Sequence, residues 1–92
     1  DEHCWGLTKE IGASLLGSEN VHESPAIMGG EDFAYYTETT KGCFVGLGVQ
    51  NAEIGATFNV HHPKFKVDEN ALPIGSALHV AFALSSLQEL KA

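Results

Sequence analysis

Apolar residues recur at helical spacing at both ends of the chain. Near the start, residues 1–16 place five of them close to one helical face: Trp5, Leu7, Ile11, Leu15 and Leu16. Gly17 follows and is suited to ending that helix in the left-handed conformation. Residues 71–90 are predicted to form a second helix, with Asn70 as its N-cap and Pro73 in its first turn, where no backbone N–H is needed. Most of this helix is apolar all round, so we expect protein to cover both of its sides.

The middle of the chain predicts one strand. Residues 43–49 are apolar throughout, as in a strand buried on both faces, and Gly46 and Gly48 would let other backbone approach closely. Before this strand, two glycines lead into an aromatic run, which indicates a short helix capped by Asp32. Residues 57–60 are a second, weaker strand candidate inside an irregular loop.

These elements do not make a complete domain. One clear strand and one weak candidate cannot form the sheet that so apolar a strand and helix need, because a parallel sheet is covered on both faces and flanked by further strands. We therefore predict an α/β fold of which residues 1–92 are the carboxy-terminal part. A place in an assembly that supplies the missing strands is the alternative.

Composition narrows the classes of function. The chain has 92 residues, with five Lys and Arg against 12 Asp and Glu, and a formal charge of -7. Scattered basic residues argue against nucleic-acid binding, which needs clustered Lys and Arg. No apolar run approaches the roughly 18–20 residues that cross a bilayer, and the acidic start is unlike a signal peptide. We therefore expect a soluble protein without membrane contact, and the two isolated cysteines favour a cytoplasmic location.

A histidine pair is the first candidate for chemistry. His61 and His62 stand next to each other before a proline. Because adjacent side chains point in different directions, one imidazole would bind a metal ion and the other would face outward. The alternative is a surface pair with no function.

A glycine-rich turn is the second candidate. Gly29 and Gly30 precede Glu31 and Asp32 at the start of the predicted short helix. Free backbone N–H groups at such a helix start can bind an anion, and a carboxylate beside them can act as a base or orient a partner. The alternative is an ordinary turn with an N-cap.

Three motifs follow one another along the chain: residues 28–34 (MGGEDFA), 42–48 (GCFVGLG) and 61–65 (HHPKF), the last leading to the acidic residues 68–69 and to residues 71–75 (ALPIG). In this order they resemble the carboxy-terminal end of the metal-dependent aminoacylase and amidohydrolase family. That family includes hippurate hydrolases, N-acyl-amino-acid amidohydrolases and indole-acetyl-amino-acid hydrolases. The resemblance covers nearly the whole chain, and three ordered motifs are more specific than any one of them.

The resemblance implies a two-domain hydrolase. Its three-layer α/β/α, zinc-peptidase-like catalytic domain is interrupted by a smaller domain through which the parent forms a homodimer, and residues 1–92 correspond to the last part of the catalytic domain. His61, which opens the His-x-Pro motif, is the implied metal ligand. Gly30, Glu31 and Asp32 are implied to shape the site beside it.

The implied reaction is hydrolysis of the amide bond of N-acyl amino acids. It uses two divalent ions (zinc, manganese or cobalt) about 3.5–4 Å apart. In the family the general-base glutamate and the other ligands come from earlier in the chain, so we assign no catalytic residue to residues 1–92. A catalytic metal needs three or four protein ligands. We therefore expect these residues alone to bind metal weakly and to hydrolyse nothing.

Two other functions stay open at this point. A non-catalytic protein-interaction module would use the apolar carboxy-terminal helix as its docking face. A related metallo-dipeptidase or carboxypeptidase would share the late histidine, although residues 31–34 (EDFA) are closer to the acyl-amino-acid branch. The preferred acyl group and amino acid depend on residues outside this chain.

Overall fold

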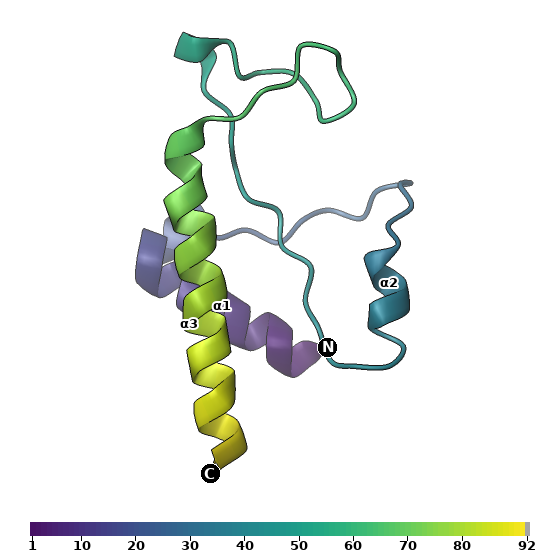
Figure 1. Cartoon of the computed structure of the whole chain (residues 1–92), viewed down its shortest axis with the longest axis vertical. Helices are drawn as coiled ribbons and strands as arrows, with labels where there is room; N and C mark the ends of the chain where they lie inside the picture. The colour runs from purple at the N-terminus through teal and green to yellow at the C-terminus, as the bar shows by residue number, and fades with distance from the viewer. Residues whose placement is uncertain (92) are drawn as a thin grey trace.

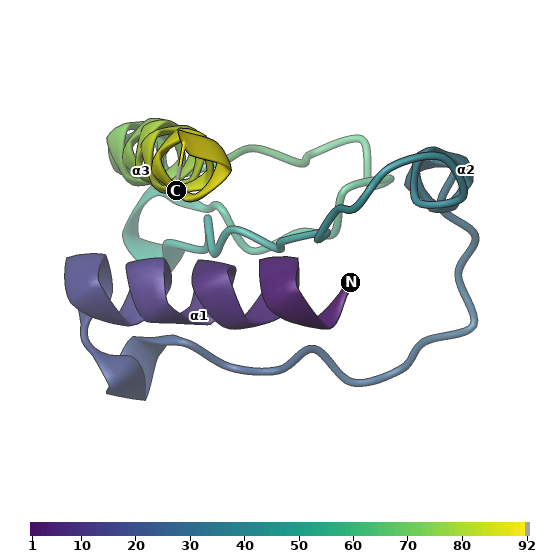
Figure 2. The same cartoon turned by 90° about the horizontal axis from the view of Figure 1, so that it is seen from below.

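Two long helices cross each other and define the molecule. The structure is a computed structural model that describes residues 1–91. Its helical elements, in chain order, are α1 (Glu2–Leu16), η1 (Ser18–Asn20), α2 (Phe33–Tyr36), η2 (Ala52–Ile54), η3 (Glu69–Ala71) and α3 (Leu72–Lys91). Figure 1 shows α3 along the long axis, with α1 crossing behind it and α2 standing apart on one side. An extended segment, residues 43–50, runs between the levels of α1 and α3 (Figure 2).

Helix α1 forms where the apolar spacing predicts it. The Asp1 side chain caps it by accepting a hydrogen bond from the Cys4 amide at 2.9 Å. Cys4, Ile11 and Gly12 are buried along it. Gly17 ends the helix with a positive φ of 87°, as expected, but its ψ of 144° lies outside the left-handed helical region.

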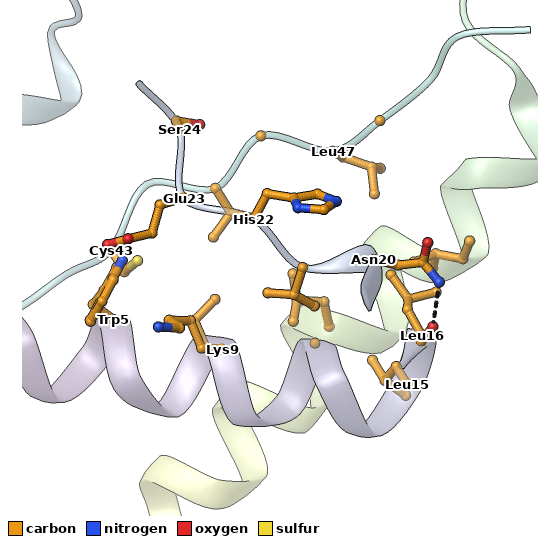
Figure 3. Close-up of a pocket in the computed structure, with 18 of the residues that line it drawn as sticks. Trp5, Lys9, Leu15, Leu16, Asn20, His22, Glu23, Ser24, Cys43 and Leu47 are labelled. Carbon is orange, nitrogen blue, oxygen red and sulfur yellow. Dashed lines mark hydrogen bonds between the residues drawn. The ribbon is translucent and has the colours of Figure 1, made fainter. Parts of the chain in front are cut away.

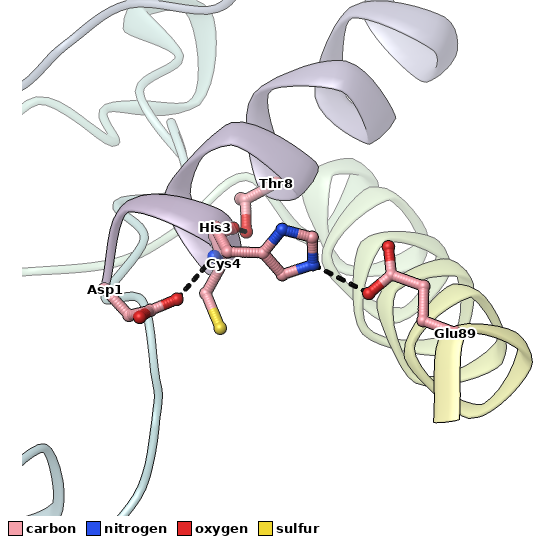
Figure 4. A network of polar contacts seen from close by, with 5 residues as sticks. All are labelled: Asp1, His3, Cys4, Thr8 and Glu89. Atoms are coloured by element: carbon pink, nitrogen blue, oxygen red, sulfur yellow. Dashed lines mark hydrogen bonds and ion pairs between the residues drawn. The ribbon is translucent and has the colours of Figure 1, made fainter. Parts of the chain in front are cut away.

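Helix α3 begins one residue later than predicted, directly after the short helix η3. Asp68, not Asn70, is the capping residue. It caps η3, the short helix that runs directly into α3, and its carboxylate accepts a hydrogen bond from the Asn70 amide at 3.0 Å. Pro73 lies in the first turn of α3, as predicted. Near the other end of the helix, Glu89 accepts a hydrogen bond from His3 of α1 at 2.7 Å (Figure 4).

Only one side of α3 is covered. Half-buried positions recur every three or four residues on the side that packs on α1 and on the extended segment: Ile74, Gly75, Leu78, Ala81, Phe82 and Ser85. The other side is exposed and apolar: Leu72, Val80, Leu84, Leu87 and Leu90. The expectation that protein covers both sides is therefore not met within residues 1–91.

Helix α3 also bears on the membrane prediction. Among residues 1–91, one helical stretch, Glu69–Lys91, is long and apolar enough to cross a membrane by length and composition alone. The prediction that the chain has no apolar run long enough to cross a bilayer was therefore wrong. Core helices of soluble proteins pass the same test, because they too are apolar over many turns.

The predicted strand does not form within residues 1–91. Residues 43–49 are extended but lie outside any sheet, and the only β-type pairing in the described part of the chain is an isolated antiparallel bridge between Asn51 and Ala56. Residues 57–60 form no strand either. A strand needs a neighbour to accept and donate its backbone hydrogen bonds, and among residues 1–91 no other strand pairs with this segment. The α/β prediction is thus not confirmed, because the described residues hold helices and loops without a sheet.

The described residues enclose very little core. The buried apolar residues are Cys4, Ile11, Ala56 and Ala71. The accessible surface is 7644 Å², whereas a folded monomer of this mass exposes about 5,200 Å². The radius of gyration is 14.9 Å, against about 12 Å for a compact domain of this length. The described residues are therefore less compact, and expose more surface, than a complete domain of this length.

Candidate functional site

The two candidate histidines lie in a hydrogen-bonded turn between η2 and η3. The His62 amide donates to the Asn59 carbonyl at 2.9 Å, and the Phe65 amide donates to the His62 carbonyl at 3.0 Å. Figure 1 shows this loop beyond the amino-terminal end of α3, on the same side of the extended segment as α2. The backbone on either side of His61 is therefore fixed by local bonds.

His62 is occupied by contacts inside this turn. Its ring stacks on Phe58 with 4.2 Å between the ring centroids. Its Nδ1 accepts a hydrogen bond from the Lys64 amide at 3.0 Å. The lone pair of that nitrogen therefore points at the backbone, and the ring stabilises the turn.

His61 has an exposed side chain without such contacts. Within residues 1–91, its ring makes no hydrogen bond and no aromatic stack. Both of its ring nitrogens are open to an external partner, and imidazole nitrogen is a common ligand of divalent metals. The two rings therefore differ: the His62 ring is held inside the turn, whereas the His61 ring has no such contact among residues 1–91. The predicted role of His61 as a metal ligand stays a prediction.

Gly30, Glu31 and Asp32 are exposed at the start of α2. Glu31, not Asp32, caps this helix, because its Oε1 accepts from the Phe33 amide at 3.2 Å. The Asp32 side chain makes no capping hydrogen bond, so the predicted cap was wrong. Gly30 has an ordinary negative φ and open space where a Cβ would stand.

The amides at the start of α2 are not free for an anion. The Phe33 amide is held by the Glu31 side chain, the Ala34 amide donates to the Glu31 carbonyl at 3.3 Å, and the Tyr35 amide donates to the Asp32 carbonyl at 3.0 Å. An anion site needs unpartnered N–H groups. These amides are therefore not available to bind an anion. The Asp32 carboxylate, in contrast, makes no hydrogen bond among residues 1–91.

The chain does not assemble a complete metal site by itself. Among residues 1–91, no three His, Cys, Asp or Glu side chains are grouped closely enough to hold an ion. No hydrogen bond joins His61 to the turn at residues 30–32 within the same range. Cys4 is buried and Cys43 half-buried. One imidazole fits the donor chemistry of a divalent ion, but the other donors have to come from elsewhere.

Sequence reasoning missed the partnership of Asn51 and Asp68. The Asn51 Nδ2 donates to the Asp68 Oδ2 at 3.1 Å, across 17 residues of chain. In the sequence, Asp68 is only one of two acidic residues that precede the last predicted helix. Nothing in the spacing of the two residues indicates that they meet.

The cavity in Figure 3 lies away from these residues. It has a volume of about 320 Å³ and is lined by α1, residues 20–24, residues 43–48 and the first turns of α3. Lys9 lies over the Trp5 ring at its rim, 4.0 Å from the ring centroid. No residue of the histidine turn or of the 30–32 turn lines it. The cavity marks incomplete packing between the two helices.

The chain is similar to one protein family and to several proteins of known name. Residues 1–85 match the family described as "Peptidase family M20/M25/M40". Over 75 residues the chain is 40% identical to the "IAA-amino acid hydrolase ILR1-like 6" of Arabidopsis thaliana, covering 82% of this chain and 16% of that protein. It is 40% identical over 81 residues to the "N-acetylcysteine deacetylase" of Bacillus subtilis (strain 168), covering 86% of this chain and 19% of that protein.

A more distant relative is a peptidase. The "Thermostable carboxypeptidase 2" of Saccharolobus solfataricus is 31% identical over 78 residues, with 85% of this chain and 20% of that protein covered. The chain thus spans no more than about a fifth of the length of these relatives. No solved structure matches it with statistical support.

Proposed function

The chain belongs to peptidase family M20/M25/M40, and on that premise we propose that it is the carboxy-terminal part of the catalytic domain of a metal-dependent amidohydrolase. The parent enzyme cleaves the amide bond of N-acyl amino acids. Relatives at 40% identity are named as hydrolases of IAA-amino acids and of N-acetylcysteine, both of which are N-acyl amino acids. The carboxypeptidase relative, at 31% identity, makes peptide hydrolysis the second candidate.

We assign to His61 the role of one metal ligand in the parent enzyme. The observation that carries this assignment is the difference between neighbours: the His62 ring is held by Phe58 and by the Lys64 amide, whereas the His61 ring is uncommitted. An exposed imidazole on a hydrogen-bonded turn is well suited to complete a site whose other donors lie on a separate segment.

The other site residues of this chain would act around the substrate. Glu31 holds the start of α2 through the Phe33 amide, which leaves the neighbouring Asp32 carboxylate free to orient a polar group of the substrate or a ligand imidazole. Gly30 has open space around it, so backbone can approach there closely. Divalent ions, when bound, supply polarisation of the amide carbonyl and an activated water.

Paired substitutions in the complete parent protein test this assignment. We expect His61→Asn to weaken metal binding at least tenfold, because a directly bound donor matters no less than the outer-shell partners, whose loss costs about 10–100-fold. His62→Asn is the matched control: its amide oxygen can still accept the hydrogen bond of the Lys64 amide. Metal content after dialysis, measured by elemental analysis, gives the readout.

Hydrolysis of indole-3-acetyl-alanine, N-acetylcysteine and an unblocked dipeptide by the same preparations separates the two candidate activities. Faster turnover of the two acylated compounds supports the amidohydrolase, and preference for the dipeptide supports the peptidase. Equal metal content in the His61→Asn and His62→Asn proteins would contradict the ligand assignment. The homodimeric state, the metal identity and the cytoplasmic location of the parent stay predictions.

A further inference from the structure

The loop that carries His61 is closed at its base by two bonds to Asp68. The Asp68 amide donates to the Val49 carbonyl at 2.9 Å. The Asp68 Oδ2 accepts from the Asn51 side chain at 3.1 Å. The chain leaves the extended segment after Val49 and returns to it at Asp68. Residues 52–67 therefore form a loop, and we call its fixed base, formed by Val49, Asn51 and Asp68, the neck.

Asn51 and Asp68 each use their side chain in two directions. The Asn51 Oδ1 accepts from the Glu53 amide at 3.0 Å, while its Nδ2 reaches Asp68. The Asp68 Oδ1 accepts a hydrogen bond from the Asn70 amide at 3.0 Å, while its Oδ2 accepts the one from the Asn51 Nδ2. The two side chains thus join the start of the loop to the start of η3, and both residues are half-buried.

The first part of the loop is tightly folded against this neck. Asn51 and Ala56 exchange both backbone hydrogen bonds at 2.9 Å, and Gly55 makes the turn between them with a φ of 75°. Ala56 is the most buried of the apolar core residues, at 2% exposure. An alanine in an otherwise exposed loop is buried because the chain closes over it.

The neck is also anchored to the body of the molecule. Leu47 of the extended segment lies against Gly75 of α3, where a Cβ would stand only 3.0 Å from the Leu47 Cδ2. Because glycine lacks a side chain, the Leu47 side chain packs directly against the backbone of α3, which fixes the spacing between the extended segment and the helix. The two ends of the loop therefore start from elements that are packed together.

We propose that Asn51 and Asp68 are positioning residues that hold the His61 loop at a fixed place relative to α3. This inference rests on the proposed function, in which the loop carries the metal ligand His61. A metal site tolerates little displacement of its donors, so a ligand on a loop needs support from rigid elements. The Asn51–Asp68 pair supplies that support from outside the histidine turn.

The pair can be broken without removing the helix cap. In the complete parent protein, Asp68→Ser keeps an oxygen for the Asn70 amide, since serine is a good N-cap, but its side chain is too short to reach Asn51. We expect faster amide hydrogen exchange at Ala56 and His62 in the metal-free protein. We also expect about tenfold weaker metal binding, the lower end of the loss seen for supporting residues around metal ligands.

A reciprocal swap provides the rescue. The double variant Asn51→Asp with Asp68→Asn exchanges donor and acceptor, keeps the net charge and retains an oxygen for both the Glu53 and the Asn70 amides. We expect it to restore slow exchange at Ala56 and to recover metal affinity relative to Asp68→Ser. A swap that exchanges as fast as Asp68→Ser overturns the proposal, and so does unchanged exchange in Asp68→Ser.

Exchange in the metal-free protein separates this inference from the proposed function. If the Asp68→Ser loop loosens while His61→Asn still binds metal normally, the Asn51–Asp68 support stands and the ligand assignment fails. If His61→Asn loses metal while Asp68→Ser changes neither exchange nor affinity, the ligand assignment stands and the support fails.

Discussion

Gly6 and Gly17 lie within and just after the same helix, but their backbones are different. Gly17 has a φ of 87°, and a Cβ there would stand 2.5 Å from the Glu19 Oε1. Gly6 lies inside α1 with no atom within 4 Å of the position of a Cβ. One substitution, glycine to alanine, should therefore change stability in opposite directions at the two sites.

We expect Gly17→Ala to lower the free energy of unfolding of the parent protein by about 1–3 kcal/mol, because alanine is strained at this φ. Gly6→Ala should raise it by up to about 1 kcal/mol through helix propensity. Thermal unfolding of both variants checks the prediction. A Gly17→Ala protein as stable as the Gly6→Ala protein would contradict the account of how α1 ends.

For single residues, the sequence predicted the features that depend only on neighbouring residues in the chain. The positive φ of Gly17 and the first-turn place of Pro73 follow from chain chemistry alone, whereas the stacking and hydrogen bond of the His62 ring were not predicted. The cap of α2 was not predicted either, because Glu31 and Asp32 can both reach that helix start and the local geometry decides between them. The Asn51–Asp68 bond depends on the path of the intervening loop, which no local pattern describes.

At the scale of elements, helices were easier to predict than the strand. A helix satisfies its own backbone hydrogen bonds, so its apolar spacing is enough to find α1 and α3. A strand is completed by other strands. The composition of residues 43–49 predicts burial between neighbours, and those neighbours are not among residues 1–91.

The exposed side of α3 gives a prediction at this scale. Leu84 is 61% exposed here, yet we expect it to be buried by the rest of the parent domain. Leu84→Glu should then destabilise the parent by about 3 kcal/mol or more, since it removes about 1.5–3 kcal/mol of apolar burial and places a carboxylate in an apolar contact.

Gln88→Glu is the matched control for Leu84→Glu, because it adds the same charge one helical turn further along at a position that already carries a polar side chain. We expect its effect to stay within about 0.5 kcal/mol. Differential scanning calorimetry of the two variants provides the comparison. Equal stability of both would mean that this side of α3 faces solvent in the parent as well.

At the scale of the whole molecule, the surface area is the informative quantity. The chain exposes 7644 Å², roughly 2,400 Å² more than a monomer of its mass should. Most of its large apolar side chains contribute to this surface, including Met28, Phe44 and Leu90. Burial of apolar area is the main favourable term in folding, so we expect most of the stability of these residues to come from contacts with the rest of the proposed parent domain.

We therefore expect the purified 92-residue chain to lack a cooperative thermal transition and to bind the dye ANS, while circular dichroism still detects helix. It should release no amino acid from an N-acyl substrate, because one imidazole cannot retain a catalytic metal. The complete parent protein, measured beside it, is the control. A sharp unfolding transition of the isolated chain would contradict its description as part of a larger core.

The segment at residues 43–49 should promote self-association of this chain when it is produced alone. It contains neither a charge nor a proline, and it is already extended with its backbone donors unused by any sheet. Identical segments of this kind can add to one another edge to edge and stack into cross-β aggregates. Cells that overproduce the 92 residues alone should collect them in inclusion bodies, with this segment at the centre of the self-association.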